Sequence, residues 1–220
     1  MSARRCGARL QKIIRLRRAA RVGLVVALAC AAPRITPLTG IPYEGRVPVT
    51  RLTPGHTRLL FRWEYDDAFF SARGEGAARI APPDSVRLDF FVDGGLGSGG
   101  AILIGDTLRT AGEDGRRYLP PVPLLWAALG VLRVSGADTV ARLDGDTIRV
   151  EIGRDPSFRA ALGGSTLAGL ERIDGGRIRE QVRRDSVRIE YRNFSSRRRL
   201  TLSSLRRVPD APYDSAIWRP

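Results

Sequence analysis

From Thr57 onward, side chains alternate between apolar and polar with a period of two, and no other feature of the sequence restricts the fold as strongly. The first such stretch carries large apolar side chains at every second position: Leu59, Phe61, Trp63 and Tyr65. This period places them on one face of an extended chain, so the stretch predicts a β-strand with one buried face. The pattern recurs over 70–80 and 86–92, and the small residues on the inner face of 70–80 leave room for bulky neighbours.

The rest of the chain predicts more short strands and one helix. We expect strands at 101–104, 107–111, 116–119, 140–143, 147–152, 167–173, 177–183, 187–191 and 200–205. Prolines at 120, 121 and 123 open a helix over 124–132 that is apolar on nearly all sides. Residues 155–158 suggest a single helical turn. The predicted fold class is mainly β (α+β): an unclosed antiparallel half-barrel of about ten strands with a short helical lid.

The N-terminal region has the parts of a secretory signal. Eight basic residues and no acidic one precede the apolar run 22–30, which falls short of the roughly 20 residues that a membrane-spanning helix needs. The run ends in Ala-Leu-Ala-Cys, which resembles the bacterial lipobox, where the cysteine is acylated and becomes the first mature residue. Ordinary cleavage that leaves Cys30 as a spare thiol is the alternative.

These features divide the chain into four parts. Residues 1–29 form the signal peptide, and 30–56, rich in proline and glycine, form a lipid-anchored tether or an arm along a sheet edge. The half-barrel domain covers 57–207, and 208–220 are a C-terminal tail.

The basic charge of the chain does not indicate nucleic-acid binding. The formal net charge is +14, but eight of the positive charges lie in the leader, and Lys12 is the only lysine. A bias toward arginine this strong is typical of genomic base composition. We therefore expect no nucleic-acid partner.

The sequence offers no positive signal for catalysis. His56 is the only histidine, and Cys6 and Cys30 are the only cysteines, so we expect no metal site, no cofactor and no catalytic nucleophile-base pair. Residues 95–100 match G-x-G-x-x-G, but a strand follows where a dinucleotide site needs a helix. A pair of carboxylates distant in sequence, as in a glycan-acting enzyme, stays open as an alternative.

Several motifs together resemble the outer-membrane lipoprotein carrier and receptor family (LolA/LolB-like proteins). They are Gly74 and Gly76 in the second strand, a Pro-Asp turn into 85–90, a glycine loop at 94–97 and a helix in mid-chain. The resemblance implies an unclosed barrel with a helical lid over an apolar cavity that takes up acyl chains of lipoproteins. It also places Leu96 where the family's membrane-bound acceptor has a protruding leucine. The lid is shorter here, and 143–183 carries more charge than an acyl-chain wall needs.

The sequence therefore predicts a lipid-anchored protein of the bacterial envelope, at the outer membrane and facing the periplasm. It would be a monomer that binds acylated or apolar cargo, a lipoprotein or a lipid, and passes it to the outer membrane. The expected cargo-binding residues are Phe61, Trp63, Phe90, Leu103, Leu125, Trp126 and Leu129, with Cys30 as the lipidation site and Leu96 as the membrane contact. A lipoprotein of the same fold that docks a protein partner without cargo is the first alternative.

Overall fold

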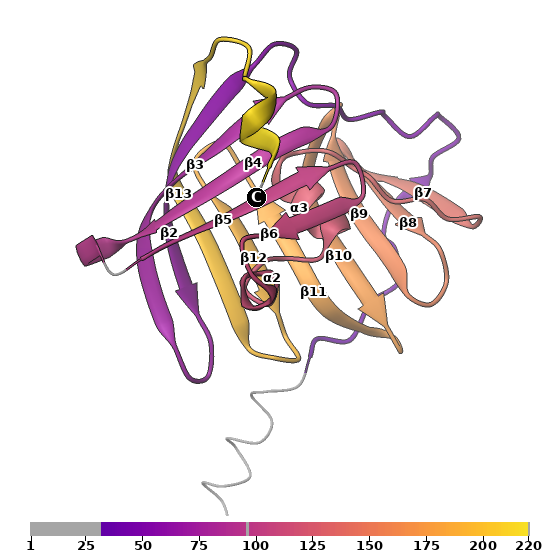
Figure 1. The fold of residues 1–220 in the computed structure, drawn as a ribbon. Coiled ribbons are helices and arrows are strands. Elements are labelled where there is room, and N and C mark those ends of the chain that lie inside the picture. Colours follow the sequence, from indigo (N-terminus) through magenta and orange to yellow (C-terminus); the bar gives the residue numbers. More distant parts are fainter. Residues whose placement is uncertain (1–31, 96, 220) are drawn as a thin grey trace, which may run out of the picture.

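Thirteen strands form one continuous antiparallel sheet in the computed structural model, which describes residues 32–95 and 97–219 (Figure 1). The first meander comprises β2 (Thr57–Asp66), β3 (Ser71–Ala81), β4 (Ser85–Val92), β5 (Ser98–Ile104) and β6 (Thr107–Thr110). The second comprises β7 (Thr139–Asp144), β8 (Thr147–Ile152), β9 (Ser157–Gly163), β10 (Thr166–Asp174), β11 (Arg177–Arg184), β12 (Ile189–Asn193) and β13 (Arg198–Pro209). Short helical segments are η1 (Asp93–Gly95), α2 (Glu113–Arg116), α3 (Val122–Ala128) and η2 (Ser215–Trp218).

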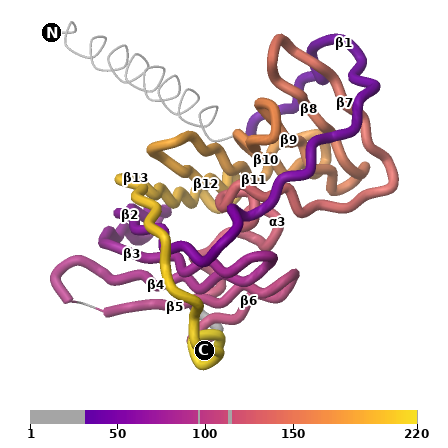
Figure 2. The backbone as a smooth tube through the Cα atoms, turned by 90° about the horizontal axis from the view of Figure 1, so that it is seen from above, coloured from indigo at the N-terminus to yellow at the C-terminus, as the bar shows by residue number. Residues whose placement is uncertain are grey.

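The two meanders join where β13 pairs with β2, from Arg199 opposite Asp66 to Pro209 opposite Thr57. The short strand β1 (Ile41–Pro42) pairs with β7, so β1 and β6 are the two free edges. The sheet bends until β2–β6 and β8–β12 face each other with α3 between them (Figure 2). The expected fold class, a mainly β unclosed antiparallel half-barrel with a short helical lid, is confirmed, with thirteen strands in the described residues instead of about ten.

The period-two alternation places one face of strands such as β2 and β8 in the core. In β2 the odd-numbered positions are buried from Thr57 to Tyr65, and the core is continuous from β2 through β12. Across the β2–β3 ladder, Phe61 lies opposite Gly76 and Trp63 lies opposite Gly74. The missing Cβ atoms make room for the two rings, because a Cβ on Gly76 would stand 2.3 Å from Cε2 of Phe61. The space expected from the small residues of this strand is thus filled by aromatic rings.

Helix α3 fills the centre of the half-barrel. All its residues from Leu124 to Ala128 are buried, and the indole Nε1 of Trp126 donates to the Gly105 carbonyl at 2.9 Å. That bond connects the helix to the β5–β6 turn, and the helix also packs against β10, β11 and β12. The expected helix over 124–132 ends earlier than predicted, because Gly130 turns the chain with φ 91°.

The proline-rich residues that precede the domain follow the sheet as an arm. The amide of Ile178 donates to the Pro33 carbonyl, and the amide of Tyr43 donates to the Ala141 carbonyl. Further along, Thr50 Oγ1 accepts the Leu132 amide at 2.6 Å, and Leu52 is buried in the core. Figure 2 shows the arm running from β1 past α3 to β2.

The C-terminal residues also pack onto the domain. Tyr213 donates its hydroxyl to the Thr57 carbonyl at 2.8 Å, and Arg87 of β4 donates to the Ile217 carbonyl at 2.8 Å. Burial and a hydrogen bond to Asp210 raise the pKa of Tyr213 to about 12. Within the described ranges, no helix is long and apolar enough to cross a membrane.

Two local predictions are wrong. Residues 116–119 were expected to be a strand, but the chain curls through α2 and further turns, with the Leu119 amide donating to the Arg116 carbonyl at 3.4 Å. This segment leaves the edge strand β6 and enters the concavity, where no strand is available to pair with it. Residues 155–158 form a turn into β9 and not a helical turn, because Ser157 already belongs to the ladder opposite Ile173.

Candidate functional site

An apolar pocket of about 410 Å³ opens on the concave side, at the end of the half-barrel formed by the β2–β3 and β4–β5 hairpins. We call it the aromatic pocket. Its lining is Trp63, Tyr65, Phe70, Ala72, Phe90, Val92, Gly97, Ser98, Gly99, Gly100, Ala101, Gly115, Tyr118, Leu119 and Leu200. Large rings cover part of the wall, and small residues of β3 and β5 leave the space between them. Its size and apolar lining are typical of small-molecule sites, which span roughly 300–1,000 Å³.

Edge-to-face ring contacts hold the walls of the aromatic pocket. Trp63 and Phe90 meet with ring centroids 5.8 Å apart, and Tyr65 meets Tyr118 at 5.3 Å. Such pairs stabilise by about 0.5–1.5 kcal/mol beyond the area they bury. Tyr118 comes from the segment 115–119, which therefore closes one side of the pocket.

The rim of the aromatic pocket carries a fixed turn. The Asp67 carboxylate accepts the amides of Phe69 and Phe70 at 2.8 and 2.9 Å and the Tyr65 hydroxyl at 2.8 Å. The amide of Phe69, followed by the Tyr65 hydroxyl, holds the pKa of Asp67 below its usual range. The turn presents Phe69 to solvent with 98% of its surface exposed.

The expected cargo-binding residues fall into three groups. Trp63 and Phe90 line the aromatic pocket. Phe61, Leu125 and Leu129, again with Phe90, surround a void of only about 30 Å³ between α3 and the sheet. Leu103 and Trp126 are buried core residues that line neither space. The role of the seven in cargo binding stays a prediction.

Sequence reasoning missed Tyr65, Phe70, Tyr118 and Leu200 as pocket residues. Tyr65 and Leu200 continue the inward alternation of β2 and β13, so the period-two pattern held a signal for both. The sequence carried no such signal for Tyr118, because the segment 116–119 was interpreted as a strand.

A buried carboxylate lies deeper in the concavity. Glu180 of β11 is 4% exposed, and its Oε1 accepts the Tyr191 hydroxyl at 2.6 Å and the Asn193 amide at 3.1 Å. Its Oε2 accepts from Arg172 at 2.8 Å. Burial and the bond to Glu180 raise the pKa of Tyr191. Each oxygen of this charge thus has a partner, as buried ions require.

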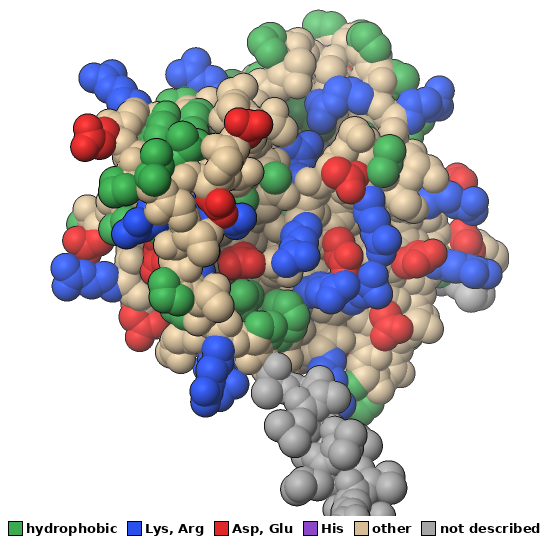
Figure 3. All heavy atoms as spheres, turned by 180° about the vertical axis from the view of Figure 1, so that it is seen from behind, with side chains coloured by type: hydrophobic (Ala, Val, Ile, Leu, Met, Phe, Trp, Pro, Cys, Tyr) green, Lys and Arg blue, Asp and Glu red, His purple; other side chains and the backbone are tan. Residues whose placement is uncertain are grey.

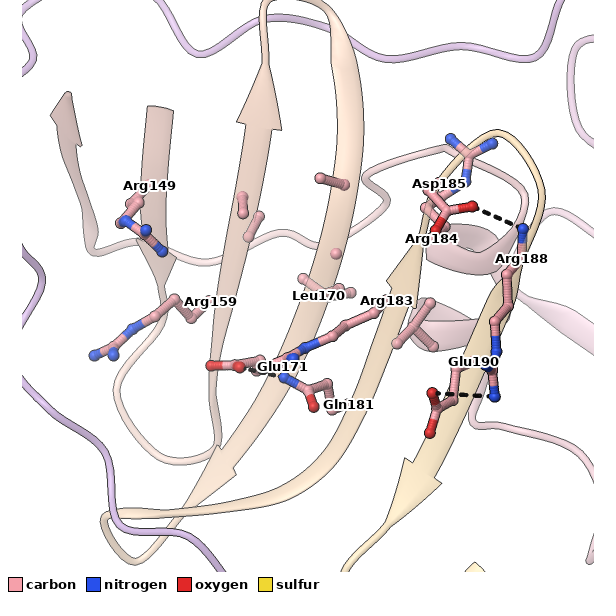
Figure 4. A pocket seen from close by; sticks show the side chains of 15 residues that line it. Arg149, Arg159, Leu170, Glu171, Gln181, Arg183, Arg184, Asp185, Arg188 and Glu190 are labelled. Atoms are coloured by element: carbon pink, nitrogen blue, oxygen red, sulfur yellow. Dashed lines mark hydrogen bonds and ion pairs between the residues drawn. The ribbon is translucent and has the colours of Figure 1, made fainter. Parts of the chain in front are cut away.

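A second candidate site, a groove of about 520 Å³, lies on the convex face over β8–β12. Figure 3 shows acidic and basic side chains interspersed on this side, and Figure 4 shows the groove itself. Several of its arginines are paired: Arg159 with Glu151 at 2.7 Å and Arg149 with Asp144 at 3.0 Å. The alternating charges make this face a solvated network of ion pairs, so we place the candidate site in the aromatic pocket.

Some sequence predictions cannot be located in the structure. Cys30, the signal peptide 1–29 and Leu96 lie outside the described residues. Among the residues that the structure describes, no group of three or more histidine, cysteine, aspartate or glutamate side chains is placed to hold a metal ion. Among the carboxylates whose burial the structure describes, which leaves out Glu113 and Asp114, Glu180 is the only buried one, and no second buried acid accompanies it in that set.

Comparisons with known proteins add a likeness of fold. No protein-family model matches the sequence, and no curated protein matches it. A LolA superfamily protein from Nitrosomonas europaea is similar in structure, with a TM-score of 0.48 and 9% identity over 77% of this chain and 92% of that one. An outer-membrane lipoprotein-sorting domain from Vibrio parahaemolyticus gives a TM-score of 0.46 and 6% identity over 74% of this chain and 89% of that one. A DUF1329 family protein from Desulfovibrio piger gives a TM-score of 0.39 and 8% identity over 76% of this chain and 90% of that one. At such identities any likeness concerns the fold, and the chemistry of the site has to come from this chain's own residues.

Proposed function

We propose that this protein binds an acyl chain or a similar apolar group in the aromatic pocket and carries it within the bacterial envelope. The observation that supports the proposal is the pocket itself, an open apolar space of about 410 Å³, whereas the void between α3 and the sheet measures only about 30 Å³. Each methylene that leaves water for such a space contributes about 0.8 kcal/mol. At about 30 Å³ for a water-sized group, the pocket has room for roughly a dozen such groups, which suits one chain better than several.

Filling the pocket is expected to abolish binding. Ala72 lies on its wall, and Ala72→Trp puts an indole into the space that the ligand needs. We expect the affinity for cis-parinaric acid, a fluorescent fatty acid, to fall at least about tenfold, the loss that displacing two buried methylenes would cause. Fluorescence titration of the purified full chain measures the effect.

The matched control is Ala168→Trp, which makes the same change on an exposed position of β10 in the convex groove. It should bind the probe like the unaltered protein. Equal affinity of the Ala72→Trp variant and the control, with both folded by circular dichroism, would contradict the proposed function.

The destination of the cargo is a further part of the proposal. We place the protein at the outer membrane, facing the periplasm and anchored through an acylated Cys30, with Leu96 touching the membrane during release. Two or more acyl chains on one cysteine bind a bilayer stably, whereas a single chain binds reversibly. The motif around Cys30 supports the anchor.

Replacing the expected acylation site should release the protein from the membrane. In cells given labelled palmitate, the wild-type chain should incorporate label and sediment with membranes, and Cys30→Ser should do neither. Cys6→Ser is the control, because the other cysteine lies before the expected cleavage site and should leave both properties unchanged. Equal sedimentation of all three chains without label would contradict the anchor.

A second candidate function, docking of a protein partner without cargo, is favoured by the exposed phenylalanines near the pocket. Phe69 is almost fully exposed and Phe91 is 54% exposed. Mass spectrometry of the freshly purified protein separates the two functions, because a carrier retains lipid and a docking protein does not.

A further inference from the structure

Three side chains form a partition between the aromatic pocket and the small void that lies between α3 and the sheet. They are Phe90 of β4, Leu119 and Leu200 of β13, and each of them lines both spaces. The void measures about 30 Å³, which is room for about one water-sized group. One side of the partition is therefore open to a ligand, and the other side is almost filled.

Two other aromatic rings hold Phe90 in this partition. Its ring lies edge to face against Phe61, with the centroids 5.6 Å apart, and against Trp63 at 5.8 Å. Phe61 and Trp63 are themselves buried, and they lie opposite Gly76 and Gly74 of β3. Because Phe61 lines the void and Trp63 lines the aromatic pocket, the ring of Phe90 stands between the two spaces.

The neighbouring strands place no side chain beside Phe90. Its partners in register are Gly76 on β3 and Gly99 on β5. Directly opposite residues of an antiparallel pair share one face of the sheet, so Phe90 carries the whole partition at this level of β3, β4 and β5. The depth of the pocket in this part of the sheet thus depends on one side chain.

We propose that Phe90 sets the length of the chain that the aromatic pocket accepts, and that the ligand is a single unbranched chain of about twelve carbons. This inference rests on the proposed function, because it specifies which apolar ligand the pocket takes. At about 30 Å³ for each methylene-sized group, a space of about 410 Å³ is full after roughly a dozen groups. A longer chain meets the ring of Phe90, and its remaining methylenes stay in water.

Saturated fatty acids of increasing length test where the pocket ends. Decanoate, dodecanoate, tetradecanoate and hexadecanoate are titrated into the full chain by calorimetry, each below the concentration at which it aggregates. Every methylene that enters the pocket should tighten binding by about fourfold. We expect dodecanoate to bind at least about tenfold more tightly than decanoate, and hexadecanoate to bind less than about threefold more tightly than tetradecanoate.

Removing the ring of Phe90 should move this limit to longer chains. Phe90→Ala joins the aromatic pocket to the void and adds the space of one ring. An apolar cavity of about 150 Å³ accommodates benzene, so the added space takes several further methylene groups. In this variant hexadecanoate should bind at least about tenfold more tightly than tetradecanoate.

Phe70→Ala is the matched control, because it removes the same side chain from the rim of the aromatic pocket. Phe70 is 51% exposed and does not line the void. The control should weaken all four acids by a similar factor and keep the limit of the unaltered protein. Phe90→Leu is a second variant in case Phe90→Ala does not fold, and it should raise the ratio between hexadecanoate and tetradecanoate above about threefold.

The possible failures are distinct. If hexadecanoate binds the unaltered protein more than about threefold more tightly than tetradecanoate, Phe90 does not limit the chain, and the inference fails while the proposed function stands. The inference also fails if both Phe90 variants are folded by circular dichroism and keep the ratio of the unaltered protein. If none of the four acids binds, both the proposed function and the inference fail.

Discussion

Replacing Trp126 by alanine is expected to lower the free energy of unfolding by about 3–5 kcal/mol, the usual cost of removing a large aromatic side chain from a core. Only 1% of Trp126 is exposed, and it belongs to α3, which lies between the two halves of the bent sheet (Figure 2). Its bond to the Gly105 carbonyl is lost as well. Urea unfolding followed by circular dichroism measures the change.

Trp126→Phe is the informative control. It keeps an aromatic ring, removes the indole N–H and leaves a smaller cavity, so it should cost about 1–3 kcal/mol. A loss below about 1 kcal/mol for Trp126→Ala would mean that α3 is not a core element. In that case α3 would be a lid that moves away from the sheet at little cost in free energy.

Adding one methyl group at Gly76 is expected to destabilise the protein by about 1–3 kcal/mol or more, the range for overpacking a filled core. The new Cβ would stand 2.3 Å from Phe61 Cε2 and 2.8 Å from the Asp89 carbonyl oxygen. Phe61 is buried and the carbonyl belongs to the β3–β4 ladder, so neither can move away freely. In an open strand position the same change would stabilise by roughly 0.5–1 kcal/mol.

Gly99→Ala provides that open position on β5, because a Cβ added there would have no other atom within 4 Å and the backbone of Gly99 is not left-handed. It should be neutral or slightly stabilising in the same urea experiment. Adding Phe61→Leu to Gly76→Ala should recover part of the loss by removing the ring that the methyl group meets. Equal stability of the Gly76→Ala and Gly99→Ala proteins would contradict the packing of Phe61 on the bare backbone.

Much of the fold could be predicted because each strand carries its own signal. The alternation in 57–66 tells which face of β2 is buried without reference to any other part of the chain. The signal for the helix was equally local, because an apolar run directly follows three prolines. Residues 116–119 were misinterpreted because their path depends on the end of β6 and on the space inside the barrel, and neither is encoded within four residues.

The candidate site was less accessible to sequence reasoning for the same reason. The pattern indicates that Leu103 and Trp126 point inward, but both fill the core, whereas Trp63 and Phe90 border open space. Whether an inward residue meets a neighbour or a cavity depends on how the two halves of the sheet approach each other. The contact of Tyr118 with Tyr65 likewise arises only when the segment after β6 is placed against β2.

The pairing of β13 with β2 also determines when this chain can finish folding. The first long strand of the domain pairs with the last one, and the other strands of both meanders and α3 lie between them in the sequence. This pair of strands can therefore form only after β13 has been made. Contacts that distant close slowly, since the entropy of the intervening loop has to be lost first. While synthesis proceeds from the N-terminus, β2 presents an open row of backbone donors and acceptors to any neighbouring chain. The interval before β13 arrives is therefore the period in which this protein is most exposed to aggregation.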